Sequence, residues 1–163
     1  MENITYIEIT FDDETKSKFK DLVNELVEES DLYYSTVKKR ISGVVTDNLH
    51  FTLFWGIDPS LMNSKELIDL VDSIDLKELA VGNLFLMPGF QNLYKILCIE
   101  IKDDDKNLFN ISERFKSFSL QNLQTREFKP HLTLAYVNPD YEIPKKEINT
   151  NFSVNVKEVR ISI

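Results

Sequence analysis

The two histidines of this 163-residue chain begin the same short pattern. His50 is followed by Phe-Thr-Leu, and His131, 81 positions further along, is followed by Leu-Thr-Leu. In a β-strand, successive side chains point to opposite faces, so each histidine shares a face with the threonine two residues later. In each motif, the residue between the histidine and the threonine and the leucine after the threonine then point to the opposite, covered face. The pattern predicts two equivalent strands that bring four polar side chains to one site: His50, Thr52, His131 and Thr133.

A similar series of elements precedes each motif. Alternating apolar residues predict strands, and apolar residues at helical spacing predict helices. In chain order we expect a strand at 3–11, a helix at 13–30, a strand at 49–56, a helix from about 64 to 74, strands at about 77–87 and 93–102, a helix at 105–120, a strand at 130–137 and, over 152–163, a final strand or a bulged pair. Asp12 or Asp13 and Ser64 are suitable helix caps, and the turn-forming residues within 88–92 favour a hairpin.

The repeated order of strand, helix and motif strand indicates two related lobes within one α+β domain that spans residues 1–163. We expect two pseudo-symmetric antiparallel sheets that line a central cleft, with the helices on the outside. With 42% hydrophobic and 28% charged residues, the composition is typical of a globular protein. A chain of this length buries roughly two thirds of its unfolded surface, which is enough for a real core.

The sequence carries a single cysteine, Cys98, which has no partner for an intrachain disulfide. This favours a reducing compartment, and we expect Cys98 to be a small buried hydrophobe in its strand. The N-terminus lacks the basic start and apolar run of a signal peptide, and no apolar stretch reaches membrane-spanning length. We therefore expect a soluble protein of the cytoplasm, or of the host cytoplasm if the gene is viral.

The formal net charge of -8 is unevenly distributed. Residues 1–31 contain ten acidic residues against three lysines and so carry -7 of the total. We interpret this acidity as the solvated face of one helix, which disfavours long duplex nucleic acids but permits a small phosphorylated ligand elsewhere. The expected partner is a nucleotide or short oligonucleotide, with no membrane partner and a monomer as the default state.

Two imidazoles and two hydroxyls form a set suited to phosphodiester cleavage. One neutral imidazole takes a proton from water or a ribose hydroxyl, and the other, protonated, donates to the departing oxygen. The hydroxyls of Thr52 and Thr133 donate to nonbridging phosphate oxygens as charge accumulates on them. Two histidines are too few ligands for a zinc site, and no cysteine near them completes one. We expect no metal and no cofactor.

Candidate substrate-binding side chains are aromatic or basic: Tyr6, Phe54, Tyr136 and Arg160, with Trp55 and Lys129 as further candidates. Aromatic rings stack on the bases of single-stranded nucleotides, and basic side chains pair with phosphate. Strict alternation places Phe54 on the His50 face, whereas Tyr136 and Trp55 point away from the histidines unless their strands twist or bulge. Core packing for the rings and an ordinary surface position for the cations remain the alternatives.

At the two motifs, the sequence resembles the 2H phosphoesterase, or LigT-like, superfamily, which is named for two H-x-T/S-x motifs on adjacent strands of a bilobal fold. The motif separation, the repeated element order and the final strand agree with that pattern over nearly the whole chain. Members act on 2',3'-cyclic phosphates, 2'-5'-linked oligonucleotides, cyclic oligonucleotides and related RNA ends. The resemblance implies the same substrate class here.

The residues after the motifs narrow the resemblance. Bacterial RNA-ligase-type members commonly carry arginines there, in patterns such as HLTLRF and HLTLAR, whereas this chain has Phe54 and Tyr136. The segment 128–136, FKPHLTLAY, is similar to the phage anti-CBASS nucleases, which destroy cyclic oligonucleotide signals. We expect a metal-independent phosphodiesterase that hydrolyses 2'-5'-linked or cyclic oligonucleotides. The alternatives are a 2',3'-cyclic phosphodiesterase or RNA-end-processing enzyme, and a noncatalytic nucleotide-binding module.

Overall fold

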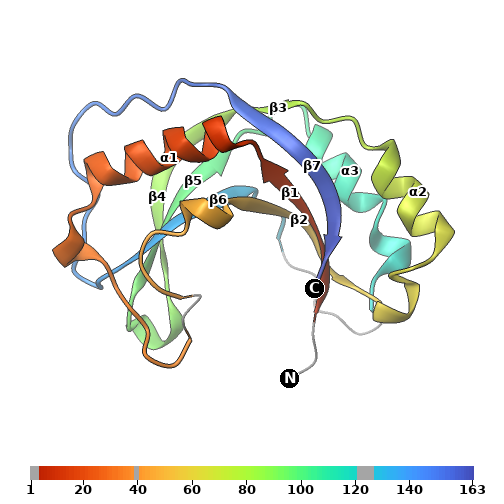
Figure 1. Cartoon of the computed structure of the whole chain (residues 1–163), viewed down its shortest axis with the longest axis horizontal. Coiled ribbons are helices and arrows are strands. Elements are labelled where there is room, and N and C mark those ends of the chain that lie inside the picture. Colours follow the sequence, from red (N-terminus) through yellow and green to blue (C-terminus); the bar gives the residue numbers. More distant parts are fainter. Residues whose placement is uncertain (1–3, 39–40, 121–126) are drawn as a thin grey trace.

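A computed structural model describes residues 4–38, 41–120 and 127–163. They form two antiparallel sheets, as expected for the α+β class (Figure 1). The four-stranded sheet has the order β2 (His50–Ile57), β1 (Thr5–Phe11), β7 (Val154–Ser162) and β3 (Glu78–Leu79). The three-stranded sheet has the order β4 (Val81–Pro88), β5 (Lys95–Ile101) and β6 (His131–Val137). The helices are α1 (Asp13–Leu26), α2 (Lys65–Ser73) and α3 (Asn107–Glu113).

Two helices begin at predicted caps, the first at Asp12 rather than Asp13 and the second at Ser64. The side chain of Asp12 accepts a hydrogen bond from the backbone N–H of Thr15 at 2.8 Å, and Ser64 accepts from Leu67 at 3.3 Å. Each bond satisfies one of the backbone donors that a helix start leaves without an intrahelical acceptor. The hydrogen bonds from Thr15 also lower the pKa of Asp12. The first helix ends at Leu26, earlier than the predicted end near residue 30.

The third helix is shorter than its apolar pattern predicts. It ends at Glu113 and is followed by a 3₁₀ turn at Lys116–Phe118, so the predicted helix at 105–120 is only partly correct. Beyond this turn the backbone pairs with the end of β2, where the N–H of Leu120 donates to the carbonyl of Gly56 at 2.9 Å. Residues that extend β2 in this way cannot continue a helix.

The apolar faces of both sheets join one core with the helices. The four apolar motif residues that were predicted to face the covered side are all buried: Phe51, Leu53, Leu132 and Leu134. Helix α1 contributes a matching stripe at helical spacing, which includes Phe19, Leu22 and Val23. Among the described residues, no helix has the length and apolar character needed to cross a membrane.

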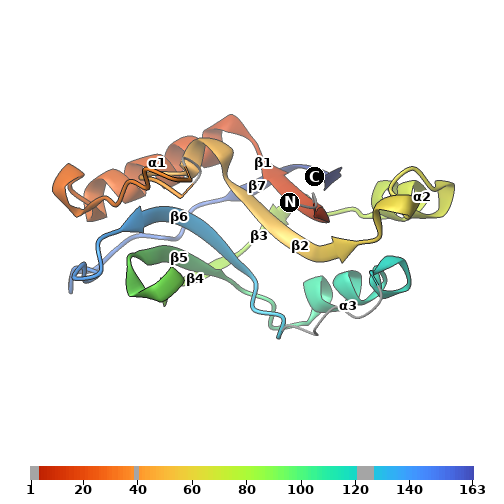
Figure 2. The same cartoon turned by 90° about the horizontal axis from the view of Figure 1, so that it is seen from below.

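Each half of the chain packs a helix against the motif strand of the other half. Helix α1 follows β1 of the four-stranded sheet but contacts β6, whereas α3 follows β5 of the three-stranded sheet but contacts β2 (Figures 1 and 2). Backbone pairing repeats this exchange: Val45 donates to the carbonyl of Leu134 at 3.0 Å, and Asp58 donates to that of Phe118 at 2.9 Å. Each motif strand is therefore held partly by the other half of the chain.

The strand predicted at 77–87 divides between the two sheets. Leu79 of β3 pairs with Val154 of β7, whereas Val81 of β4 pairs with Ile101 of β5. Ala80 lies at the crossing point, and its carbonyl accepts from the N–H of Lys102 at 2.8 Å. The β4–β5 hairpin forms as predicted, and residues 154–162 form one final strand that pairs with β1.

Candidate active site

The two motif strands lie side by side (Figure 2). They are edge strands rather than central ones, because β2 begins the order of its sheet and β6 ends the order of the other. Both sheets turn one face toward the shared core. Their other face carries His50, Thr52, His131 and Thr133, none of which is buried. We refer to these faces of the two sheets together as the motif face.

The two imidazoles are held by the same local hydrogen bond. Nδ1 of His50 lies 2.8 Å from the carbonyl oxygen of Asn48, and Nδ1 of His131 lies 2.7 Å from that of Lys129. A carbonyl oxygen can only accept, so Nδ1 carries the proton and donates in both residues. Each ring is thereby fixed in orientation and tautomer, and Nε2 is left as the atom that gains or loses a proton.

The two threonines have different neighbours across their strand pairs. Thr52 lies opposite Glu8 of β1, and Thr133 lies opposite Cys98 of β5. Burial raises the pKa of Cys98 to about 12, although a hydrogen bond with Thr133 acts in the opposite direction. Cys98 is therefore a buried thiol at neutral pH, as expected from the sequence, and it is no thiolate nucleophile.

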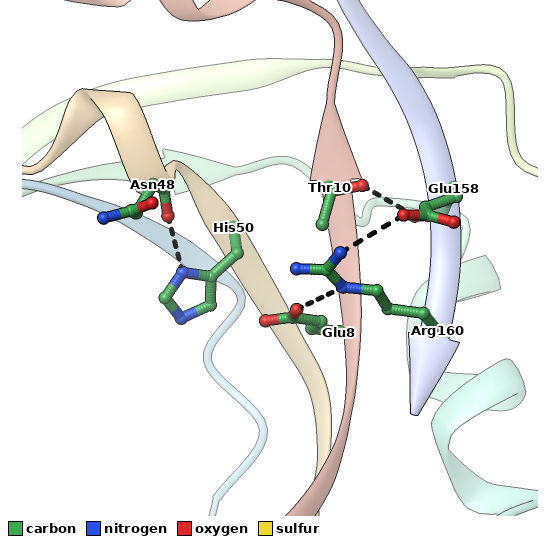
Figure 3. A network of polar contacts seen from close by, with 6 residues as sticks. All are labelled: Glu8, Thr10, Asn48, His50, Glu158 and Arg160. Carbon is green, nitrogen blue, oxygen red and sulfur yellow. Dashed lines mark hydrogen bonds and ion pairs between the residues drawn. The ribbon is translucent and has the colours of Figure 1, made fainter. Parts of the chain in front are cut away.

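Arg160 lies on the motif face and is held by two carboxylates (Figure 3). Its Nε donates to Oε1 of Glu8 at 2.7 Å, and its Nη1 donates to Oε1 of Glu158 at 3.3 Å. The Glu8 side chain is only 4% exposed, whereas that of Arg160 is 51% exposed. The hydrogen bond to Glu8 raises the pKa of Arg160, so the guanidinium stays charged.

Glu8 was not among the candidate site residues that the sequence suggested. The available signal was its position on the polar face of the strand at 3–11, between Tyr6 and Thr10. In the sheet, Glu8 is flanked by Thr52 on one side and Arg160 on the other. A carboxylate that is buried in this position needs a charged partner, and Arg160 supplies it.

A β-bulge in β2 overturns the predicted orientation of Phe54. Glu8 pairs with Thr52 but Ile7 pairs with Phe54, so Leu53 is the extra, unpaired residue. Directly opposed residues share a face, and a bulge therefore shifts the alternation by one residue. Phe54 lies on the core side with Ile7, and its ring centroid is 6.0 Å from that of the buried Phe115. It does not lie on the His50 face.

The same bulge brings Trp55 to the motif face, because Trp55 lies opposite Tyr6. Tyr6 is on that face, with its ring centroid 6.5 Å from that of His50. Strict alternation would have turned Trp55 away. The sequence analysis allowed Trp55 to face the histidines if its strand bulged, and the strand does bulge. The rings of Tyr6 and Trp55 therefore lie on the motif face beyond His50.

A matching bulge occurs in β6. Cys98 pairs with Thr133 but Leu97 pairs with Ala135, so Leu134 is the extra residue. Tyr136 thereby reaches the motif face opposite Ile96. Its ring lies edge-on to Tyr94 at 5.6 Å, and Tyr94 stacks on Tyr33 at 5.0 Å. Each motif is thus followed, at the third residue after its threonine, by an aromatic residue on the motif face.

Phe85 of β4 was missed by the sequence reasoning. It pairs with Cys98, which places it on the motif face, and its ring centroid lies 6.1 Å from that of His131. Only knowledge of the strand pairing could have identified it. Lys129, a further candidate, contributes its backbone carbonyl to His131, while its exposed side chain pairs with Glu127 at 3.5 Å. Within the described ranges, no three His, Cys, Asp or Glu side chains cluster as metal ligands.

The fold has close counterparts among solved structures. The structure of Escherichia coli LigT complexed with NADP+ aligns with 96% of this chain and with 84% of the LigT chain. The TM-score is 0.63 and the sequence identity is 16%. A structure described as a phosphoesterase aligns with 98% of this chain and with 87% of its own chain, with a TM-score of 0.61 and 16% sequence identity. The structure of Kluyveromyces marxianus Usb1 with uridine monophosphate aligns with 83% of this chain and with 72% of the Usb1 chain, with a TM-score of 0.51 and 10% sequence identity.

These structures define the class of fold. The chain has the fold of Escherichia coli LigT, as the resemblance at the paired motifs predicted. At 10–16% identity the likeness concerns the fold, and no protein-family model or curated protein matches the sequence. The structural neighbours include LigT complexes with 3'-AMP, with ATP and with phosphate.

Proposed function

We propose that the protein is a phosphodiesterase of the 2H type that cleaves RNA-type phosphodiesters. The observation that carries this proposal is the equivalence of the two motifs. Both imidazoles donate through Nδ1 to the carbonyl two residues earlier, and each has a threonine two residues later in the same strand. A purely structural role for a histidine gives no reason for a second histidine that is held in the same way. Acid–base catalysis by a pair of imidazoles requires two that are both oriented.

The proposed reaction follows from these groups. Nε2 of one neutral imidazole takes a proton from a ribose hydroxyl or from water, and the resulting oxygen attacks phosphorus. Nε2 of the other, protonated imidazole donates its proton to the oxygen that departs. The hydroxyls of Thr52 and Thr133 donate to nonbridging oxygens as negative charge develops on them. Arg160, held by Glu8 and Glu158, presents its guanidinium on the same face.

The ligand class is inferred from the structural neighbours and from the motif face. LigT structures hold NADP+, 3'-AMP or ATP, and the Usb1 structure holds uridine monophosphate. These ligands all combine a phosphate with a base that can stack on an aromatic ring. Tyr6 and Tyr136, with Trp55, provide such rings on the motif face. We therefore assign a small nucleotide or short oligonucleotide as the substrate.

Within this class we favour 2'-5'-linked or cyclic oligonucleotides. Phe54 and Tyr136 occupy the places of the arginines in ligase-type motifs, and Phe54 packs toward the core, so neither position supplies a cation. A 2',3'-cyclic phosphodiesterase or RNA-end-processing activity is the alternative. Cleavage of cyclic oligonucleotides would make the protein an antagonist of defence systems that signal through nucleotide second messengers.

Chromatographic analysis of a substrate panel in EDTA tests the proposal. The panel contains 2',3'-cyclic nucleotides, 2'-5' and 3'-5' dinucleotides, and cyclic di- and trinucleotides, each incubated with the wild type and with the double variant His50→Ala/His131→Ala. The proposal predicts cleavage of one class by the wild type and none by the variant. Equal cleavage by both proteins would contradict it. Ligand-induced thermal stabilisation without turnover would instead indicate a nucleotide-binding module.

A further inference from the structure

A groove of about 720 Å³ opens beside His131, where β4, β5 and the start of α3 meet residues 127–130. Its volume lies within the range of small-molecule binding pockets. The lining is apolar at five positions: Phe85, Ile101, Phe109, Phe128 and Pro130. It is charged at seven: Glu100, Lys102, Asp103, Asp104, Lys106, Glu127 and Lys129. We call it the lateral groove.

The lateral groove adjoins the candidate acid–base site through several lining residues. Phe85 contacts the His131 ring at a centroid distance of 6.1 Å. Glu100 lies directly opposite His131 across the β5–β6 pair. The carbonyl of Lys129 is the acceptor that fixes Nδ1 of His131. A substituent on a phosphate bound at His131 would therefore enter this groove without crossing an intervening element.

One wall of the groove is a row of aromatic rings. Phe109 lies edge-on to Phe128 at 5.9 Å, and Phe128 lies edge-on to Phe51 at 6.2 Å. Phe51 is buried inside the His50 motif, so the row is anchored in the core. Phe109 is 37% exposed at the other end. An anchored ring with an open surface is suited to stacking on a nucleobase.

The charges of the groove favour a base over a run of phosphates. Three lysines face four carboxylates, so the lining has no net positive charge. Asp103 accepts from the backbone N–H groups of Leu108 and Phe109, at 2.8 and 3.0 Å, and so has a structural role. Carboxylates repel phosphate but accept hydrogen bonds from the exocyclic amines of bases. This lining therefore suits one nucleoside rather than a polyphosphate chain.

We propose that the lateral groove binds the nucleobase attached on the His131 side of the scissile phosphate. This inference rests on the proposed function and deepens it. The base stacks on the row formed by Phe109 and Phe128, next to Phe85. A substrate with nucleosides on both sides of the phosphate then gains contacts that a nucleoside 2',3'-cyclic phosphate lacks. The protein is accordingly a dinucleotide-or-longer enzyme rather than a mononucleotide one.

Phe109→Ala tests the groove without changing the motifs. The substrates are an adenine dinucleotide of the cleaved linkage, its two analogues that each lack one base, and adenosine 2',3'-cyclic phosphate. Loss of a stacking partner lowers kcat/KM about tenfold. We expect that loss for the full dinucleotide and for one abasic analogue, and none for the analogue that lacks the groove base. Phe109→Tyr, which keeps the ring, restores the wild-type value.

Phe90→Ala is the matched control, because Phe90 is 67% exposed in the turn between β4 and β5 and does not line the groove. It should leave every substrate unchanged, and thermal melts confirm that both variants are folded. A loss on Phe109→Ala that is equal for all substrates, or no loss at all, overturns the groove assignment while the proposed function stands. A wild type that cleaves none of the substrates contradicts the proposed function and the groove assignment together.

Discussion

Arg160 donates through Nε to Oε1 of Glu8 at 2.7 Å, across neighbouring strands of the four-stranded sheet. The carboxylate is buried and the guanidinium is half exposed on the motif face. A buried carboxylate is costly unless it is paired, so this contact fixes the guanidinium on the strand beyond β1, with Glu8 between it and Thr52. It connects the stability of the sheet with the electrostatics of the candidate site.

Arg160→Ala should therefore destabilise the fold, because it leaves the buried Glu8 carboxylate without its partner. We expect a loss of about 1–3 kcal/mol in the free energy of unfolding, nearer the lower end because Arg160 is solvated. The double variant Glu8→Gln/Arg160→Ala should recover part of this loss. Lys157→Ala, which removes an exposed cation from the same strand, is the control for charge. Denaturant melts in which Arg160→Ala and Lys157→Ala lower the free energy of unfolding by the same amount would contradict this account.

Removing either threonine hydroxyl should impair catalysis more than folding. Thr52→Val and Thr133→Val keep the shape of the side chain but lose the donor to a nonbridging oxygen. We expect kcat to fall about 10²-fold for each, the usual cost of one such donor, while Thr→Ser at the same positions retains most activity. Steady-state kinetics on the cleaved substrate provide the measurement. Valine variants with wild-type kcat would exclude this role for the hydroxyls.

The strand positions of the candidate site residues could be predicted because their signals are local. The period-two pattern placed His50, Thr52, His131 and Thr133 on strands, with buried residues between them, and the structure agrees. The cap Ser64 was also predicted, and the cap of the first helix was narrowed to Asp12 or Asp13, since a helix start is determined by neighbouring residues. Such features depend on a few consecutive positions.

The errors arise where a distant segment determines the local structure. Phe54 was placed on the wrong face because the bulge at Leu53 is defined by pairing with β1. Phe85 was missed because its proximity to His131 depends on the pairing of three strands. The helix at 105–120 was too long because its last residues pair with β2 instead. Apolar periodicity alone contains none of these long-range partners.

Cys98 should be protected from thiol reagents in the native protein. Burial raises its pKa to about 12, so Cys98 is a thiol rather than a reactive thiolate near neutral pH. We expect iodoacetamide to label Cys98 in guanidinium chloride but not in native buffer over the same time, as read by mass spectrometry. Equal labelling in both conditions would show that the thiol is accessible.

The cap at Asp12 should make stability depend on pH in acid. Its hydrogen bonds hold the folded-state pKa below the ordinary value of 3.8. The stabilisation is therefore complete above about pH 4 and is lost as the pH falls through the folded-state pKa. Asp12→Ala should cost about 1 kcal/mol of unfolding free energy at neutral pH, and this difference should shrink in acid. Asp12→Asn, which caps without titrating, should keep its advantage over Asp12→Ala at both pH values.

The most direct test of the central claim is the pH dependence of kcat/KM for the wild type, His50→Ala and His131→Ala on the cleaved substrate. Two-histidine acid–base catalysis predicts a bell-shaped profile for the wild type. Each variant should lose about 10²–10⁴-fold in rate, and each should lose a different limb of the bell, which identifies the base and the acid. A variant that keeps the wild-type rate and profile while remaining folded would contradict the account.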